Sequence, residues 1–306
     1  MMPEAPAPAG SLVIILGSTA SGKTRAAVRF ALKHNGEIIS ADSRQVYRGM
    51  DIGTGKDLSE YRTEEGAVPF HLIDIYEPEE DYDLFRFRKD FMAAWSDIIS
   101  RGKLPILCGG SAMYIDSVLR NYELRESSRG DDGLDALSGE ELRGRLLRLR
   151  PELHNTTDLL ERERMIRALR IASSSGDIYT LPPMRIMVFG ITHPLPVLRQ
   201  RIGLRLKQRL EEGMIAETER LLARGLSHER LHYFGLEYKY ISMYLKGELN
   251  LNDMRQKLEA AIYEFARKQL KWYRKMEREG VTIHWVTEEE LLRVNLFDDT
   301  PPQKTL

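Results

Sequence analysis

The stretch from Leu12 to Thr24 reads LVIILGSTASGKT, and it decides the fold. Its first five residues are apolar and end at a glycine, which is the pattern of a strand buried on both faces of a parallel sheet. A helical pattern follows at once, because Ala27, Phe30 and Ala31 are spaced to share one helix face. The chain is therefore predicted to run from a buried strand through a glycine-rich loop into a helix.

The loop fits the phosphate-binding pattern G-x-x-x-x-G-K-[ST], in the strand–loop–helix context that the pattern requires. Glycines let backbone N–H groups close around phosphate oxygens, and the start of the helix adds its positive dipole end. The lysine brings a charge to the terminal phosphates, and the hydroxyl of Thr24 can ligate Mg²⁺. The alternative is a plain glycine turn. The residues predicted to bind a diphosphate or a nucleotide are Gly17, Ser18, Thr19, Ala20, Ser21, Gly22, Lys23 and Thr24.

Strand and helix patterns alternate along the rest of the chain. The further predicted strands are 37–41, 70–75, 104–108, 185–191 and 281–286, and the further predicted helices are 85–100, 197–222 and 253–276. Such alternation favours right-handed crossovers between parallel strands. The predicted fold class is α/β, a P-loop NTPase-like doubly wound parallel sheet.

One long segment breaks this alternation. Residues 121–183 hold no convincing strand, and Arg-rich helical patterns at 142–150 and 159–171 are flanked by Ser, Gly and Pro. We predict a helical insertion domain over this segment. The domain boundaries are then a discontinuous core of 11–120 and 184–287, an insertion of 121–183, and tails of 1–10 and 288–306.

The composition excludes several classes of protein. The 306 residues hold 45 Lys and Arg against 46 Asp and Glu, and 42% hydrophobic residues allow a sizeable core, so a charged disordered chain is excluded. The single cysteine, Cys108, excludes a disulfide scaffold and a multi-cysteine zinc site. There is no secretory signal pattern, and no apolar run approaches the roughly 20 residues of a membrane helix. We expect a cytoplasmic protein without a membrane partner.

The near-neutral total hides an uneven distribution of charge. Acidic residues are concentrated at 51–90, whereas basic residues cluster at 143–170, 199–209 and 268–278. Trp272 and Tyr273 are interleaved with the last cluster and are candidates for stacking on bases. Each basic stretch taken alone is also consistent with a solvated helix face. Together they favour a nucleic-acid partner bound by one basic side of the molecule.

Two predicted strand ends carry candidate catalytic groups. Asp42 follows the second predicted strand and should face the crevice at the carboxyl ends of the strands. Its carboxylate can be a Mg²⁺ partner, a general base, or the N-cap of a following helix. Gly109, Gly110 and Ser111 follow the fourth predicted strand. The glycines there permit close approach of the backbone to a ligand, and the serine can bind an oxygen or cap the next helix.

Eight blocks of sequence carry a resemblance to a known family. They are GSTASGKT (17–24), SADSRQVYRGMDIGTGK (40–56), FHLID (70–74), GGSAMY (109–114), ERMIRALRI (163–171), RIGLRLKQRLEEGMIAETERLL (201–222), GLEYKY (235–240) and RKQLKWYR (267–274). In this order and near these spacings, they resemble the bacterial tRNA dimethylallyltransferases, also called tRNA isopentenyltransferases. The resemblance extends from Leu12 to about Val286, and its second block is long enough to be specific.

The resemblance implies an activity, a cofactor and partners. The activity is transfer of a dimethylallyl group from dimethylallyl diphosphate to N6 of adenine 37 in tRNA, giving N6-isopentenyladenosine and diphosphate. The implied cofactor is Mg²⁺, and the helical insertion is implied to grip the anticodon stem-loop. We expect a monomer, and leave open whether ATP or another nucleotide also binds the phosphate loop.

The same resemblance assigns roles to single residues. Asp42 matches the general base, Ser111 stands where the family usually has Thr beside the diphosphate, and Arg205 matches an arginine that contacts the diphosphate. Family GGTGLY is GGSAMY here, and family GYR[EQ] is GLEYKY, which leaves the role of Tyr238 open. The positions that match tRNA-contacting segments are Asp42, Ser43, Arg44, Gln45, Glu163, Arg164, Met165, Ile166 and Arg167.

Three other functions are compatible with a phosphate loop. A small-molecule kinase would use the same loop and Mg²⁺, with the helical insertion as its lid. A prenyltransferase that acts on free adenine nucleotide would keep the chemistry but would not need the insertion. A non-catalytic, nucleotide-dependent RNA-binding module would bind tRNA without modifying it.

Overall fold

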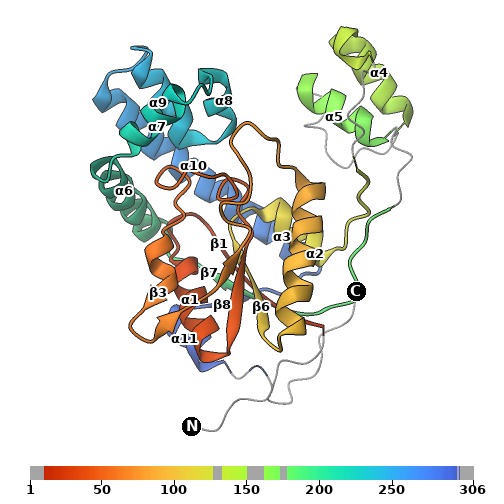
Figure 1. The fold of residues 1–306 in the computed structure, drawn as a ribbon, viewed down its shortest axis with the longest axis vertical. Helices are drawn as coiled ribbons and strands as arrows, with labels where there is room; N and C mark the ends of the chain where they lie inside the picture. The colour runs from red at the N-terminus through yellow and green to blue at the C-terminus, as the bar shows by residue number, and fades with distance from the viewer. Residues whose placement is uncertain (1–9, 127–132, 150–161, 173–177, 295, 297–306) are drawn as a thin grey trace. The chain divides into compact units, whose positions relative to one another are not determined.

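The computed structural model of the chain describes residues 10–126, 133–149, 162–172, 178–294 and 296 (Figure 1). The chain divides into two compact units, one of residues 1–120 and 182–306 and one of residues 121–181. We call them the core unit and the insertion. The observed insertion ends at Leu181, where the sequence predicts an end at residue 183.

The core unit is built on one parallel sheet. Among the described residues this sheet has six strands in the order β5-β2-β6-β1-β7-β8, with β1 paired to β6 on one side and to β7 on the other. The doubly wound parallel sheet predicted from the sequence is confirmed. The strands are β1 (Ser11–Gly17), β2 (Gly36–Ser40), β5 (Phe70–His71), β6 (Leu104–Gly109), β7 (Arg185–Ile191) and β8 (His284–Val286).

Two strands are shorter than the sequence predicts. The strand predicted over 70–75 is formed only by its first two residues, because Leu72 and Asp74 adopt φ values of 63° and 57° in the left-handed region and so break the ladder. Strand β8 begins at His284 rather than at residue 281, since only its last three residues pair with β7. The other four strands lie within one residue of their predicted bounds.

Helices cover both faces of the sheet (Figure 1). Val13 and Ile15 of β1 pack in one apolar cluster with the buried face of α1, and the alternate residue Ile14 is fully buried on the other side, which explains the continuous apolar run in the sequence. The helices are α1 (Lys23–Lys33), α2 (Leu84–Ser100), α3 (Ala112–Leu119), α6 (Leu195–Glu211), α7 (Met214–Ala223), α8 (His228–Tyr233), α9 (Leu236–Leu245), α10 (Leu251–Arg278) and α11 (Glu288–Arg293).

The single helix predicted over 197–222 is wrong, because the chain forms α6 and α7 there. The break lies at Gly213, whose φ of 101° is incompatible with a continuing α-helix and caps the start of α7. The helices predicted over 85–100 and 253–276 are confirmed as α2 and α10. No helix in the described ranges is both long and apolar enough to cross a bilayer.

The tail predicted from residue 288 onward is also wrong in its first part. Residues Glu288–Arg293 form α11, which begins with a reciprocal capping box between Thr287 and Glu290. Leu291 is fully buried in the cluster that contains α1, and the Glu288 carboxylate pairs with Arg25 and Arg29 of α1. The remainder of that predicted tail, and residues 1–9, lie outside the described residues except for Val294 and Leu296.

The insertion has an apolar core of its own. Helices α4 (Gly139–Leu149) and α5 (Arg162–Ala172) correspond to the two Arg-rich patterns, of which 150 and 159–161 lie outside the described residues. The two ends of the insertion are tied by Asn121, whose side chain donates to the carbonyl of Leu181 at 2.9 Å and accepts from its N–H at 2.7 Å. The core side chains are Leu134, Leu142, Leu146, Met165, Ile166 and Leu169.

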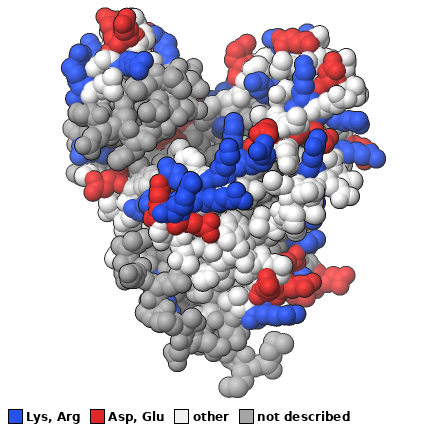
Figure 2. All heavy atoms as spheres, turned by 180° about the vertical axis from the view of Figure 1, so that it is seen from behind, with Lys and Arg blue, Asp and Glu red and all other residues white. Residues whose placement is uncertain are grey.

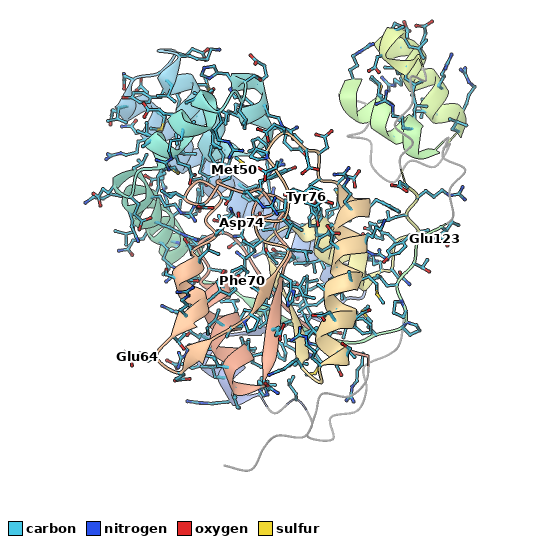
Figure 3. All side chains as sticks on the ribbon, in the orientation of Figure 1. Met50, Glu64, Phe70, Asp74, Tyr76 and Glu123 are labelled. Atoms are coloured by element: carbon cyan, nitrogen blue, oxygen red, sulfur yellow. The ribbon has the colours of Figure 1, made fainter. Side chains whose placement is uncertain are left out.

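A loop of the core unit crosses the carboxyl ends of the strands. It follows β2, and Figure 3 shows its Met50 near Asp74 and Tyr76, which follow β5. The backbone N–H of Asp74 donates to the carbonyl of Gln45 at 3.1 Å, and Lys56 of the same loop is buried and pairs with Asp74. This loop is thereby fixed as a wall above the sheet.

Glu37 of β2 is a buried carboxylate that joins three elements. Its side chain is 4% exposed and accepts hydrogen bonds from Arg101, at the end of α2, and from His71 of β5 at 2.8 Å. The hydrogen bonds and charge of the Arg101 guanidinium lower the pKa of the Glu37 carboxyl to about 2.

We predict that this carboxylate gives the protein a pH-dependent share of its stability. Because the folded pKa lies below the ordinary value of 4.5, the stabilisation is complete above pH 4.5 and is lost as the pH falls toward 2. Glu37→Gln should therefore lower the free energy of unfolding in urea at pH 7, and the difference from wild type should shrink at pH 3. Glu64→Gln, an exposed control, should show no difference. An equal deficit of Glu37→Gln at every pH would contradict the assignment.

Candidate functional site

A pocket of about 250 Å³ lies in the core unit where the carboxyl ends of β1, β2 and β6 meet. Its wall comes from the phosphate loop, the loop after β2, the loop after β6, and parts of α6, α9 and α10. These segments are far apart in the sequence, and the parallel sheet brings them together. The residues predicted as site residues that line this pocket are Thr19, Lys23, Thr24, Asp42, Ser43, Arg44, Gln45, Ser111 and Arg205.

The phosphate loop forms one side of the pocket. Gly22 has a φ of 87° and directly precedes α1, so Lys23 is the first residue of that helix. The Lys23 ammonium donates to the carbonyl of Ser18 at 3.3 Å, and burial lowers its pKa. Among the described residues, the hydroxyls of Ser18 and Ser21 are buried without a hydrogen-bond partner. Burial removes water that would stabilise the charged ammonium, and a bound anion would compensate for that loss.

Asp42 faces the phosphate loop across the pocket. Its Oδ1 accepts the N–H of Arg44 at 2.9 Å, and the residues after it form turns rather than a helix. The N-cap interpretation of Asp42 is therefore wrong, and the carboxylate is oriented by a local turn. The N–H of Ser43 donates to the hydroxyl of Ser111 at 3.1 Å, so the predicted serine supports the loop that carries Asp42.

Gly109, the last residue of β6, and Gly110 after it make room for neighbouring protein atoms, and both line the pocket. A Cβ on Gly109 would lie 2.2 Å from the carbonyl oxygen of Ala41, and one on Gly110 would lie 2.6 Å from Nε2 of Gln269. Because both glycines line the pocket, the expectation that they permit close approach of a ligand stays a prediction. Cys108, just before them, is buried, and burial raises the pKa of its thiol to about 12, so it is a poor nucleophile.

Two arginines of α6 bring positive charge to the pocket. Arg205 lines the pocket and pairs with Asp57, and burial lowers the pKa of its guanidinium to about 9. Arg209 lies one helical turn further and also lines the pocket, with its guanidinium 3.8 Å from both Asp57 and Glu237. The sequence places Arg209 in a predicted basic cluster but not in the predicted site, although the i, i+4 spacing puts it on the same helix face as Arg205.

The role of Tyr238 is structural. Its side chain is fully buried, and its hydroxyl donates to Oε1 of Glu217 at 2.8 Å. The same carboxylate accepts the N–H groups of Asp51, Ile52 and Gly53 at distances of 2.8 to 2.9 Å. Glu217 and Tyr238 therefore hold the loop after β2 in place, and neither lines the pocket.

The predicted tRNA-contacting residues are placed in different ways. The Arg44 guanidinium lies over the ring of Tyr233 at 4.3 Å, and both ends of the Gln45 amide are hydrogen-bonded within the protein, to Ser40 and Gly55. Met165 and Ile166 are only 6% exposed because their apolar side chains pack in the core of the insertion, so they do not present a surface to RNA. Glu163, Arg164 and Arg167 lie in α5, and their side chains fall outside the described part.

Two of the predicted basic clusters lie on helices of the core unit, at 199–209 on α6 and at 268–278 on α10. Of these two, only the cluster on α10 forms a continuous surface. In α6, Arg201 donates to the carbonyl of Ala20 at 2.7 Å, and Arg205 and Arg209 turn toward the pocket. Tyr273 is fully buried, so its predicted stacking role is wrong. Figure 2 shows a band of Lys and Arg side chains across the face where α10 lies. The exposed basic residues at the end of α10 are Arg267, Lys268, Lys271, Arg274, Lys275 and Arg278.

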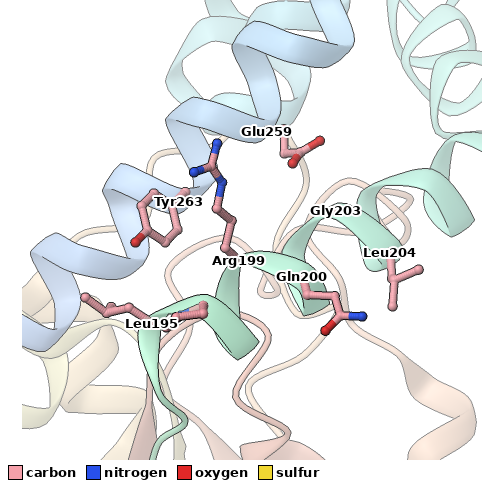
Figure 4. Close-up of a pocket in the computed structure, with 8 residues that line it drawn as sticks. Leu195, Arg199, Gln200, Gly203, Leu204, Glu259 and Tyr263 are labelled. Atoms are coloured by element: carbon pink, nitrogen blue, oxygen red, sulfur yellow. The ribbon is translucent and has the colours of Figure 1, made fainter.

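A second, wider depression lies between α6 and α10, apart from the phosphate loop. It measures about 610 Å³ and is lined by Leu195, Leu204 and Tyr263, with Arg199 lying 5.6 Å from the Tyr263 ring centre (Figure 4). None of its lining residues belongs to the phosphate loop or to the loop of Asp42. The pocket beside the phosphate loop is smaller, but it alone of the two combines Lys23 with a carboxylate.

Comparison of the sequence with known proteins gives one family. The sequence model of the family described as IPP transferase matches residues 45–276, and that of isopentenyl transferase matches residues 10–64. The tRNA dimethylallyltransferase 1 of Geotalea uraniireducens (strain Rf4) is 50% identical over 298 residues, which cover 93% of this chain and 98% of that protein. The tRNA dimethylallyltransferase 2 of Citrifermentans bemidjiense is 52% identical, with 92% of each chain covered.

Comparison with solved structures agrees with the sequence relatives. The full-length tRNA isopentenylpyrophosphate transferase of Bacillus halodurans is similar with a TM-score of 0.67 and 31% identity, covering 92% of this chain and 93% of that one. A eukaryotic dimethylallyltransferase acting on tRNA matches with a TM-score of 0.73 at 19% identity, covering 92% of this chain and 75% of that one, and so shows a shared fold.

We predict that the Glu217 carboxylate is required to hold the pocket wall. Glu217→Gln should lower the free energy of unfolding by about 2–3 kcal/mol, because an amide NH₂ would then face N–H donors that need an acceptor. Chemical denaturation measures this, and Glu219→Gln, on the exposed face of the same helix, is the matched control. If both variants unfolded at the wild-type denaturant concentration, the structural role of Glu217 would be refuted.

Proposed function

The chain belongs to the IPP transferase family, and from that premise we propose that it transfers a dimethylallyl group from dimethylallyl diphosphate to N6 of adenine 37 in tRNA. The products are N6-isopentenyladenosine and diphosphate. The observation that carries the proposal is the pocket in which a phosphate loop, two arginines and Asp42 surround one cavity. Displacement of a diphosphate by an amine requires cationic groups that bind the leaving diphosphate and a base that accepts the proton of the amine. This pocket offers both.

The cationic half of the pocket stabilises the leaving group. As the bond between the allylic carbon and the diphosphate oxygen breaks, negative charge grows on the diphosphate. Lys23, Arg205 and Arg209 line the side of the pocket where this charge develops. Because these groups are already in place, little reorganisation is needed at the moment of reaction.

Mg²⁺ is consistent with this half of the pocket. No cluster of three or more His, Cys, Asp or Glu side chains suited to a metal occurs in the described ranges, so the ion would be held by the Thr24 hydroxyl together with phosphate oxygens and water. When bound, Mg²⁺ neutralises charge on the diphosphate.

Asp42 activates the acceptor amine. The N6 lone pair of adenine is shared with the purine ring, so the amine is a weak nucleophile until its proton is held by a base. The Asp42 carboxylate, oriented by the Arg44 N–H, accepts the N6 proton as the bond from nitrogen to carbon forms. One bond to carbon forms, one breaks, and the proton goes to Asp42.

The remaining wall of the pocket suits an apolar prenyl chain. Its apolar and aromatic lining comes from Tyr61, Phe234, Leu236, Ile262 and Phe265. Such a lining excludes water, which would otherwise capture the allylic cation and hydrolyse the donor.

The basic face of α10 and the insertion, residues 121–181, are proposed to bind the anticodon stem-loop. The target adenine must leave its stack, which costs a few kcal/mol and less in a single-stranded loop, and phosphate contacts offset that cost. We further propose that the enzyme acts in the cytoplasm as a monomer. We leave ATP binding at the phosphate loop to a competition test against dimethylallyl diphosphate.

Asp42→Asn should separate chemistry from donor binding. Loss of the base should lower kcat for prenylation of unmodified tRNA by about 10²- to 10⁴-fold, while the affinity for dimethylallyl diphosphate stays near that of wild type. Mass analysis of digested tRNA and calorimetric titration of the donor measure the two quantities. Glu64→Gln, at an exposed turn, should behave as wild type. Turnover of Asp42→Asn at the wild-type rate would refute the assignment of the base.

Replacing Lys268 and Lys271 together by alanine should weaken tRNA binding without affecting the donor. If both contact phosphates, KM for tRNA should rise, and the slope of log affinity against log salt should become shallower by about 1–2. The control is Lys103→Ala, at the amino end of β6, where the side chain bonds to Asn35. An unchanged salt slope in the double variant would show that this face does not bind the tRNA backbone.

A further inference from the structure

Gln269 of α10 bridges two loops of the pocket. Its side chain is 7% exposed, and its Oε1 accepts the backbone N–H of Thr19 at 2.9 Å. Its Nε2 donates to the carbonyl of Gly110 at 2.8 Å. The two partners fix the orientation of the amide, because one offers only a donor and the other only an acceptor.

A second side chain of the same helix acts in parallel. The hydroxyl of Tyr273, one helical turn after Gln269, lies 3.2 Å from the carbonyl of Gly17 and 3.3 Å from that of Gly110. The helix therefore contacts the phosphate loop at two residues and the loop after β6 at one. The absence of a side chain on Gly110 is what leaves space for the Gln269 amide.

One of the two bridged loops leads to Lys23, and the other is bonded to the segment that carries Asp42. The phosphate loop leads directly to Lys23. The loop after β6 is hydrogen-bonded to the segment of Asp42, through Ser111 N–H to the carbonyl of Ala41 at 3.1 Å and through the Ser111 hydroxyl to Ser43 N–H. Gln269 thus connects the phosphate loop, which is proposed to bind the leaving group, with the loop that supports the proposed base Asp42.

We propose that Gln269 is a positioning residue, which sets the distance between the phosphate loop and Asp42. The inference rests on the proposed prenyl transfer. A displacement at carbon needs the leaving group, the carbon and the attacking nitrogen in line, so a shift of one loop against the other by about 1 Å lowers the rate by up to roughly 100-fold.

The bridge also requires an uncharged side chain. The position that a Cβ on Gly110 would take lies 2.6 Å from Nε2 of Gln269 and 3.6 Å from Nζ of Lys23, so the amide and the ammonium are near neighbours. A glutamate at residue 269 would lose the donor to Gly110 and would place a negative charge beside the lysine that awaits a diphosphate. Charge, and not size, would then disturb the site.

The test compares Gln269→Ala with Gln269→Glu. Gln269→Ala should lower kcat about 10- to 100-fold with KM for tRNA within about twofold of wild type, because the loops lose their spacing but the RNA face is intact. Gln269→Glu should in addition raise KM for dimethylallyl diphosphate. Amide hydrogen exchange in the phosphate loop should be faster at Thr19 in Gln269→Ala than in wild type.

Met254→Ala is the matched control for simple loss of stability. Met254 is fully buried in the core between α6 and α10, so this variant should lower Tm while kcat, assayed below Tm, stays at the wild-type value. Wild-type kcat and wild-type exchange at Thr19 in Gln269→Ala would overturn the proposal. If wild-type protein itself failed to prenylate tRNA, the proposed function would fail, and the exchange measurement alone would decide whether the bridge exists.

Discussion

Parallel pairing of β2, β6 and β1 is the constraint on which the rest of the site depends. Because neighbouring strands run in the same direction, three loops that are distant in sequence leave the sheet at one edge. One is the phosphate loop, one carries Asp42, and the third is bonded to the Asp42 segment through Ser111 and to the phosphate loop through Gln269. The sheet thus brings these three loops together, and helices α6 and α10 add Arg205, Arg209 and Gln269 to the pocket that they form.

The positive charges of Lys23 and Arg205 at the pocket wall need a negative partner, and this is the second constraint on the site. Lys23 and Arg205 line its wall half-buried, and Asp57 pairs with Arg205. A diphosphate adds negative charge beside these cations, and so it restores the charged forms that burial disfavours. On our proposal the apolar wall of the same pocket contacts the prenyl group, so that one small cavity holds both a highly charged leaving group and a hydrocarbon.

The sequence predicts best where local rules decide the outcome. The apolar run before the phosphate loop and the alternation of strands and helices predicted the sheet, and the motif spacing predicted which loops line the pocket. The sequence does not mark Gly213 as a helix break. It does not predict α11 either, because the stability of that helix comes from Leu291 packing on α1, which lies near the other end of the chain. The contacts of Glu217, Tyr238 and Gln269 are likewise tertiary, so no local pattern could reveal them.

The most direct test of the account uses dimethylallyl diphosphate that is labelled in both its hydrocarbon and its phosphorus atoms. After incubation with the protein, Mg²⁺ and unmodified tRNA, the account predicts that the carbon label is found on adenine N6 of the tRNA and that all of the phosphorus label is released as diphosphate. Carbon and phosphorus labels that stayed together, or γ-phosphate of ATP that reached an acceptor while the tRNA stayed unmodified, would contradict prenyl transfer and favour phosphate chemistry.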